Sequence, residues 1–208
     1  MPRIPLNDAF EKIFELAKED NTFTVRTAAS YKWYERHIKG LRLEFDKQTL
    51  LTDKIRQKNS VEIGKMYTYL YKPKLHKTLP YYDIFPLVFP IEKHTDGFLA
   101  INLHYLPPNL RALLMDKLYD LANKEVDESG GIETGTKLTI SYEILKSFNK
   151  YKLSRVCFRK YLYSNVRTKF TIINPNEWDA AIFLPSEKFQ NETKENVWSE
   201  TRAKLKRI

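Results

Sequence analysis

Residues 146–170 read KSFNKYKLSRVCFRKYLYSNVRTKF and contain eight basic side chains, six aromatic ones and no Asp or Glu. Long cationic side chains at such intervals suit a phosphate backbone, because every phosphate that they neutralise releases counterions. The tyrosines among them either stack on exposed bases or pack in a core with solvated hydroxyl groups. We interpret the stretch as a nucleic-acid contact. A solvated face without a partner and a contact with an acidic protein surface are the alternatives.

The predicted contact residues of this stretch are Lys146, Lys150, Lys152, Arg155, Arg159, Lys160, Arg167 and Lys169. If the segment SRVCFRKYLYSNVR is helical, Arg155 and Arg159 share one face, with Lys152 beside them. A second stretch without acids, KMYTYLYKPKLHK, adds Lys65, Lys72, Lys74 and Lys77, and the C-terminal RAKLKR is a third. Mixed charges would keep a protein soluble equally well, so three acid-free patches indicate a polyanionic or acidic partner.

The histidines do not predict a metal centre. They stand at positions 37, 76, 94 and 104, and none has the close pairing of a helical metal site. His94 and His104 flank a turn near Asp96, but a third ligand is missing. Asn102 and His104 fit a hydrogen-bonding pair under a loop better than a ligand pair. We therefore predict no metal site.

A basic protein also invites a nuclease hypothesis, in which an Asp is followed by Glu-x-Lys on neighbouring strands. Asp179 followed by Glu192 and Lys194 matches formally, but this triplet lies in a polar stretch where no sheet would hold a metal. Phosphate-binding glycine loops and nucleophile elbows are missing from the sequence. We predict a protein that is not an enzyme, with no catalytic residue and no cofactor.

Composition narrows the class of partner. Lys and Arg number 35 against 26 Asp and Glu, which gives a net charge of +9 and a pI of about 9.4. Such a field attracts nucleic acid, although ribosome-like or anionic lipid surfaces would attract it too. No apolar run approaches the roughly 20 residues that span a bilayer, so we expect no membrane partner. Cys157 is the only cysteine, and its apolar neighbours predict a small buried side chain.

These residues must be positioned by a fold that the patterns predict as α+β. Residues 1–60 form an N-terminal helical extension, residues 61–185 an α+β core domain, and residues 186–208 a charged C-terminal helix or tail. The first helix carries an apolar stripe of Phe10, Ile13, Phe14 and Ala17, and the second carries Tyr34, Ile38, Leu41 and Phe45. The sheet is small and antiparallel, either open or barrel-like, and one helix packs on it.

Proline and glycine divide the central region. Between Gly64 and Leu106 the pattern is that of strands, and KMYTYLYK and GFLAINLHYL alternate well. Pro86 and Pro90 favour an edge strand or an extended segment for FPLVFPIEK. Pro107 and Pro108 then open a helix through PPNLRALLMDKLYDLANK. Further on, KFTIINPNEWDAAIFLP predicts one or two strands around an NPN turn.

Four blocks of sequence are distinctive: GKMYTYLYKPKLHKTLPYYDIFPLVFPIEKHTDGFLAINLHYLPPNLRALLMDKL, LTISYEILKSF, VCFRKYL and EWDAAIFLPSEKF. Together they resemble the DNA end protector protein family of contractile-tailed, T-even-like bacteriophages, over about residues 31–205. The blocks are a signature of the fold and contain no catalytic motif. The resemblance carries no binding residues, so the predicted contacts rest on the charge pattern alone.

The resemblance implies a non-enzymatic virion protein near the portal or neck. It implies binding to the ends of the packaged linear double-stranded DNA genome, and protection of those ends from host exonuclease after injection. The implied partners are the DNA ends and other virion proteins, namely portal, neck or tail subunits. The implied locations are the virion and, during assembly and after injection, the host cytoplasm. Two alternatives stay open: a structural subunit of the neck, tail or baseplate that docks on acidic protein surfaces, and an RNA-binding protein with MYTYLY as a stacking platform.

Overall fold

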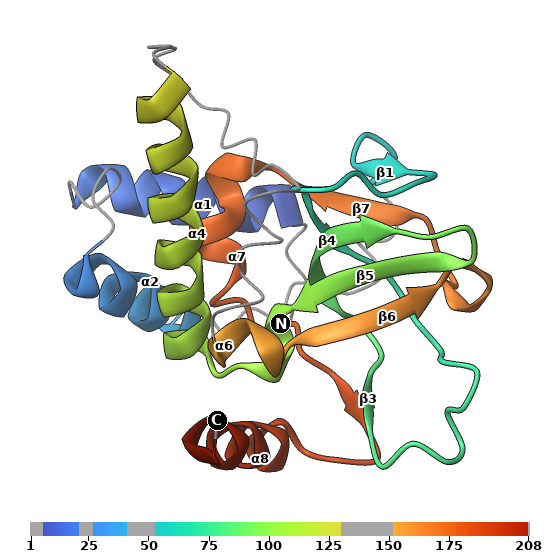
Figure 1. Cartoon of the computed structure of the whole chain (residues 1–208). Coiled ribbons are helices and arrows are strands. Elements are labelled where there is room, and N and C mark those ends of the chain that lie inside the picture. The colour runs from blue at the N-terminus through green and yellow to red at the C-terminus, as the bar shows by residue number, and fades with distance from the viewer. Residues whose placement is uncertain (1–5, 21–26, 41–52, 130–151, 208) are drawn as a thin grey trace.

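Helices and strands occupy opposite sides of this α+β protein, as Figure 1 shows. The computed structural model describes residues 6–20, 27–40, 53–129 and 152–207. Its α-helices are α1 (Leu6–Glu19), α2 (Ala28–Gly40), α4 (Pro108–Ser129), α6 (Lys152–Arg155), α7 (Trp178–Ala181) and α8 (Lys194–Arg207). Its strands are β1 (Gln57–Lys58), β2 (Met66–Thr68), β3 (Tyr82–Asp83), β4 (Leu87–Lys93), β5 (Gly97–Asn102), β6 (Phe158–Leu162), β7 (Phe170–Ile173) and β8 (Phe189–Gln190).

The long helices form where the apolar stripes predict them. In α1 the side chains of Phe10, Ile13 and Ala17 are buried on one face, which confirms the predicted stripe. In α2 Tyr34 and Ile38 are buried in the same way, while the continuation of that stripe lies outside the described residues. The predicted start of a helix at the double proline is confirmed by α4, which packs against the sheet.

The main sheet is antiparallel throughout, in the order β1-β7-β2-β4-β5-β6, and β3 pairs with β8 in a separate small sheet. The main sheet is open, so the barrel-like alternative is not adopted. β4 lies between β2 and β5, and the predicted edge position for this strand is therefore wrong. The register shifts between Pro90 and Glu92, and this bulge accommodates the proline that lacks an N–H donor.

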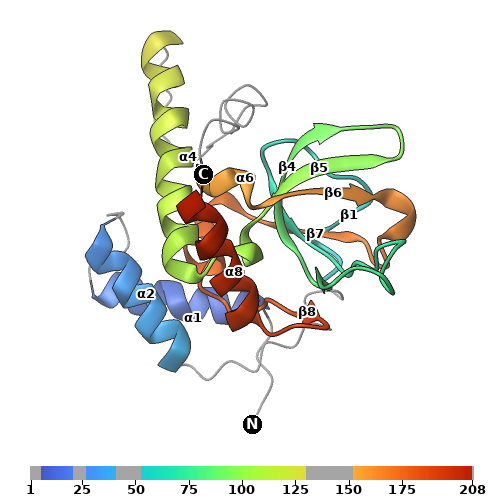
Figure 2. The same cartoon turned by 60° about the horizontal axis from the view of Figure 1, so that its bottom comes forward.

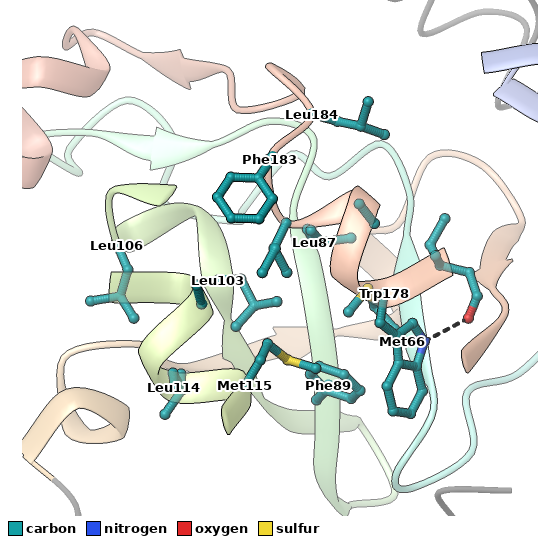
Figure 3. Close-up of a cluster of buried hydrophobic side chains, with 14 of the residues drawn as sticks. Met66, Leu87, Phe89, Leu103, Leu106, Leu114, Met115, Trp178, Phe183 and Leu184 are labelled. Atoms are coloured by element: carbon teal, nitrogen blue, oxygen red, sulfur yellow. Dashed lines mark hydrogen bonds between the residues drawn. The ribbon is translucent and has the colours of Figure 1, made fainter. Parts of the chain in front are cut away.

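The larger hydrophobic cluster fills the space between the sheet and the helices (Figure 3). It joins side chains from α1, α2, the sheet, α4, α7 and α8 in one core. Phe89 of β4 meets the edge of Trp178 of α7, with ring centroids 4.9 Å apart. The Trp178 indole also donates to the carbonyl of Ile173 at 2.9 Å, the dashed line in Figure 3. This core fixes α7 against the end of β7.

A smaller, mainly aromatic cluster lies on the other face of the sheet. Phe98 of β5 lies 5.8 Å from Phe170 of β7, measured between ring centroids, although two strands separate β5 from β7 in the sheet. Strands in a flat sheet lie about 4.8 Å apart, so this sheet must curl strongly around the aromatic rings. Gly97 of β5 allows the backbone of β6 to approach closely, because a Cβ atom there would lie only 2.0 Å from the carbonyl oxygen of Tyr161.

The C-terminal part is more helical than the sequence predicts. The strand β7 precedes the NPN motif as expected, but a 3₁₀ turn (Pro175–Glu177) and α7 follow it, so a second strand there is wrong. Asn174 and Glu177 form a capping box, which starts this helical segment. The charged end forms α8, and Val197 anchors it in the core. The segment TKLTISYEILKSF lies outside the described residues.

Candidate nucleic-acid interface

The two longest acid-free stretches of the sequence meet in space at one short ladder. Tyr71 and Val166 form an antiparallel bridge. On either side of it, the amide of Lys72 donates to the carbonyl of Asn165 at 3.1 Å, and the amide of Arg167 donates to the carbonyl of Leu70 at 2.8 Å. The fold thus places residues 72–77 beside residues 163–169. Figures 1 and 2 show both segments at the side of the sheet away from the helices.

Alternation along these extended segments decides which side chains point inward. Tyr71 is buried in the aromatic cluster, 4.9 Å from the ring of Tyr161, and Phe170 is buried in the same cluster. Val166 packs against that cluster as well. Side chains one position away from these residues point to the opposite face, because successive residues of an extended chain alternate. Lys72, Arg167 and Lys169 each lie one position from an inward residue, and their side chains are exposed.

The exposed cations at this place form what we call the distal basic surface, defined as Lys72, Lys74, Lys77, Arg167 and Lys169. None of these five side chains forms an ion pair with a carboxylate of the described residues. No Asp or Glu occurs between residues 63 and 82 or between residues 144 and 176. The two stretches therefore contribute positive charge without an acid of their own, which suits a polyanion.

The loop that carries three of these lysines has a defined shape. Its ends are held together, because the amide of Tyr71 donates to the carbonyl of Ile84 at 2.8 Å. Inside the loop, the carbonyl of Leu75 accepts from the amides of Thr78 and Leu79, both at 3.0 Å. These bonds are typical of a compact Ω-loop, whose ends lie close together. We call residues 72–81 the Ω-loop.

Two other predicted contact residues are exposed but paired. Lys160 lies 3.0 Å from Asp96 at the β4–β5 turn, and Lys65 lies 2.5 Å from Glu62. Lys65 also lines a surface pocket of about 350 Å³, whose wall includes Arg56. Burial opposes the charge of Arg56, but two 2.6 Å bonds to Glu177 outweigh it and raise the pKa of the guanidinium. Both signs of charge thus line this pocket, which makes it a weaker site for a polyanion.

The predicted helical face of Arg155 and Arg159 does not form. The helix α6 ends at Arg155, and Arg159 lies in the strand β6, where it turns inward. Its guanidinium stacks over the ring of Tyr105, 3.7 Å from the centroid, and donates to two backbone carbonyls. Arg159 therefore has a packing role. Lys152 and Arg155 are exposed on α6, whereas Lys146 and Lys150 lie outside the described residues.

The aromatic residues between the cations belong to the core. Tyr67, Tyr69 and Tyr71 are buried, so the predicted alternative of a base-stacking platform in MYTYLY is wrong. Burial raises the pKa of Tyr69 and of Tyr161 well above the ordinary value of a phenol. Cys157 is buried as predicted, and burial raises the pKa of its thiol to about 12.

A buried polar cluster was predicted only in part from the sequence. His104 Nδ1 lies 2.8 Å from Asp83 Oδ2, and His104 Nε2 lies 3.0 Å from Ser186 Oγ. Asn102 donates to Asp83 at 2.9 Å and accepts from the amide of His104 at 3.0 Å, which confirms the predicted pair. The alternation of INLHYL reveals Asn102 and His104, but no local pattern reveals Ser186, 82 residues further on.

The distances match those of an Asp-His-Ser relay, and the environment argues against acyl transfer. His104 and Asp83 are buried, and only 6% of Ser186 is exposed, so a substrate carbonyl cannot reach the hydroxyl. Trp198 of α8 donates to the carbonyl of His104 at 2.9 Å. The cluster thus joins the C-terminal segment to the sheet, and it acts as a structural clamp.

A second buried group reinforces this clamp. The guanidinium of Arg111, on α4, donates to the carbonyls of Leu106 at 2.7 Å and Ile182 at 2.9 Å. It also lies 3.4 Å from Glu187, to which Lys194 donates at 3.0 Å. Burial alone would raise the pKa of Glu187, but the charges of Arg111 and Lys194 help to outweigh it and hold this pKa at about 2.

The described residues offer neither a metal site nor a membrane-spanning helix. They contain no group of three or more His, Cys, Asp or Glu side chains that could hold a metal ion. None of their helices is both long and apolar enough to cross a membrane.

The chain matches a known protein family over most of its length. A family model described as the phage T4 terminal DNA protecting protein matches residues 6–204, which run from α1 into α8. No curated protein and no solved structure matches the chain.

Proposed function

The chain belongs to the phage T4 terminal DNA protecting protein family, and from this premise we propose that it binds the ends of linear double-stranded DNA through the distal basic surface. The observation that carries the proposal is the meeting of the two acid-free stretches at the Tyr71–Val166 bridge. Their side chains supply five exposed cations without a carboxylate partner among the described residues. Such cations bind phosphates of any sequence, which suits a protein that must recognise a terminus.

Protection follows from occupancy of the terminus. An exonuclease must reach a free end, so a protein seated there blocks it without any turnover of its own. The buried state of Asp83, His104 and Ser186 favours this non-enzymatic function. We place the protein in the virion, near the portal or neck where the genome ends lie, and in the host cytoplasm during assembly and after injection.

The helix α8 offers a separate surface for other virion proteins. Val197 and Thr201 are buried on its inner side, while Arg202 and Lys206 are exposed. We assign this outer side to acidic surfaces of portal, neck or tail subunits. A protein that lacked affinity for DNA and bound only such subunits would be a structural component of the particle instead.

The test compares labelled linear duplex with covalently closed circular duplex of the same sequence over a salt series. We expect tighter binding to the linear form, and a log–log salt slope that reports the number of phosphates contacted. An exonuclease assay with the same linear DNA should show slower degradation when the protein is bound. Equal affinity for both forms would refute end binding. No binding to either near physiological salt would refute the proposal and favour the structural role.

A further inference from the structure

The Ω-loop exposes a large apolar side chain among its lysines. Leu75 is 61% exposed, although it lies between Lys74 and Lys77. Single exposed apolar side chains are common on protein surfaces, so exposure alone means little. What distinguishes Leu75 is its place within the distal basic surface, beside cations that would bring it close to DNA.

The backbone of Leu75 is held firmly in this exposed position. Its carbonyl accepts from the amides of Thr78 and Leu79 and from the Thr78 hydroxyl, at 3.0, 3.0 and 3.1 Å. The ends of the loop are joined through Tyr71 and Ile84. A side chain on such a backbone loses little conformational freedom when it makes a contact, which favours binding.

We infer that Leu75 packs on the outer face of the terminal base pair while the surrounding lysines and Arg167 hold the flanking phosphates. This inference rests on the proposed function and specifies how an end differs from internal duplex. The terminal base pair presents an exposed apolar face that no neighbouring pair covers. A leucine on that face removes apolar surface from water on both sides of the contact.

The same contact is unfavourable inside a duplex. Proteins that insert leucine or isoleucine between internal base steps must first unstack them, which costs a few kcal/mol per step. At a terminus that face is already exposed, so this cost does not arise. Leu75 therefore adds affinity for ends only, whereas the cations add affinity for all duplex. The preference for ends should depend on this one side chain.

The experiment measures affinity for a short blunt duplex and for the same duplex with both ends closed by hairpin loops. We expect the wild-type protein to prefer the open duplex. Leu75→Ala should lower affinity for the open duplex about tenfold and leave affinity for the closed one unchanged. Leu75→Trp, which supplies a large apolar surface at the same position, should keep the preference. Fluorescence of 2-aminopurine at the terminal position, but not at a central one, should change when the wild-type protein binds.

Matched controls remove an exposed apolar side chain elsewhere. Ile55→Ala, beside β1, and Leu113→Ala, on α4, truncate residues that are 87% and 45% exposed. Both should leave the affinities for open and closed duplex unchanged. Lys74→Ala should weaken binding to both forms equally, because its contact is with phosphates.

The outcomes separate this inference from the proposed function. If wild-type protein prefers open ends and Leu75→Ala keeps that preference, the inference is overturned and the proposed function stands. If Leu75→Ala weakens both forms alike, Leu75 contacts duplex generally, and the inference is again overturned. If the wild-type protein binds neither form, the proposed function fails and the inference fails with it.

Discussion

Two groups of cations in this fold differ in whether a carboxylate faces them. In the clamp, the buried Arg111 lies against Glu187, and beside β1 the buried Arg56 is bound by both oxygens of Glu177. On the distal basic surface the five cations are exposed and unpaired within the described residues. The same residue types thus stabilise the fold in one region and remain available for a partner in the other.

The difference follows from the cost of burying charge. A buried guanidinium or carboxylate loses its hydration and is tolerated only with a partner of opposite charge. Asp83, Glu177 and the Glu187 side chain are therefore placed in the interior, where they compensate buried cations or complete buried hydrogen bonds. Carboxylates used there cannot neutralise the surface. The distal basic surface is positive partly because these acids are inside.

The largest effect should come from breaking the clamp. Arg111→Ala removes two bonds to backbone carbonyls and leaves Glu187 buried with Lys194 as its remaining cation. We expect the free energy of unfolding to fall by about 3 kcal/mol or more, because a buried charge loses its partner. Urea denaturation followed by circular dichroism measures it.

The control for this change lies on the same helix. Lys117 is exposed on α4 and pairs with the exposed Asp120. Lys117→Ala should change the free energy of unfolding by less than about 0.5 kcal/mol. If Arg111→Ala were as mild as this control, the clamp would have no special role in stability.

The next effect is the acid sensitivity of the clamp. The pKa of Glu187 is about 2 in the folded protein, against an ordinary value of 4.5. A lowered folded pKa stabilises the fold above the unfolded pKa, and this contribution is lost as the pH falls toward the folded pKa. Between pH 5 and pH 3 the wild type should therefore lose about 2 kcal/mol more stability than Glu187→Gln.

The measurement is a pair of urea titrations at each pH. The comparison between wild type and Glu187→Gln cancels the acid effects of all other carboxylates. Parallel losses in the two proteins would show that Glu187 is not held in its charged form. Binding of DNA at the distal basic surface should not depend on this substitution at neutral pH.

The fold could be predicted where periodicity is local. Apolar stripes located α1, α2 and α4 because each helix buries one face against the core. The central position of β4 could not be predicted, since a proline normally marks an edge and the bulge that accommodates Pro90 has no sequence signal. The helical turn after NPN was missed although Asn174 and Glu177 have the spacing of a capping box, which is a local signal. Its capping box depends on Glu177, which also binds Arg56, 121 residues earlier.

The candidate site could be predicted in composition but not in arrangement. The absence of Asp and Glu identified both stretches that meet at Tyr71 and Val166. Their contact spans 95 positions of the sequence, and no pattern within either stretch indicates it. Arg159 shows the limit most clearly, since it belongs to the basic stretch and yet stacks on Tyr105. Charge pattern identifies cations, whereas partners and burial decide which of them are available.

A smaller effect distinguishes the distal basic surface from the other exposed cations of the same stretch. Lys72→Ala combined with Arg167→Ala should weaken DNA binding about tenfold and reduce the log–log salt slope by about 2, because two phosphate contacts are lost. Lys152→Ala combined with Arg155→Ala, on α6, removes the same charge and serves as the control. Its slope should stay unchanged. The reverse result would place the DNA on α6, as the predicted helical face required.

The smallest effect concerns the reactivity of two thiols toward a thiol reagent. One is the native Cys157 in the core, and the other is introduced beside the distal basic surface. Cys157 is buried, its thiol donates to the carbonyl of Leu153 at 3.3 Å, and its pKa is raised to about 12. A thiol reagent at neutral pH should therefore leave it unmodified until the protein unfolds, with or without DNA. Ser164 is exposed beside the distal basic surface, so the thiol of Ser164→Cys should react at once. Since DNA on that surface would cover residue 164, it should slow this reaction alone. If bound DNA did not slow the reaction at residue 164, the DNA would not lie on the distal basic surface.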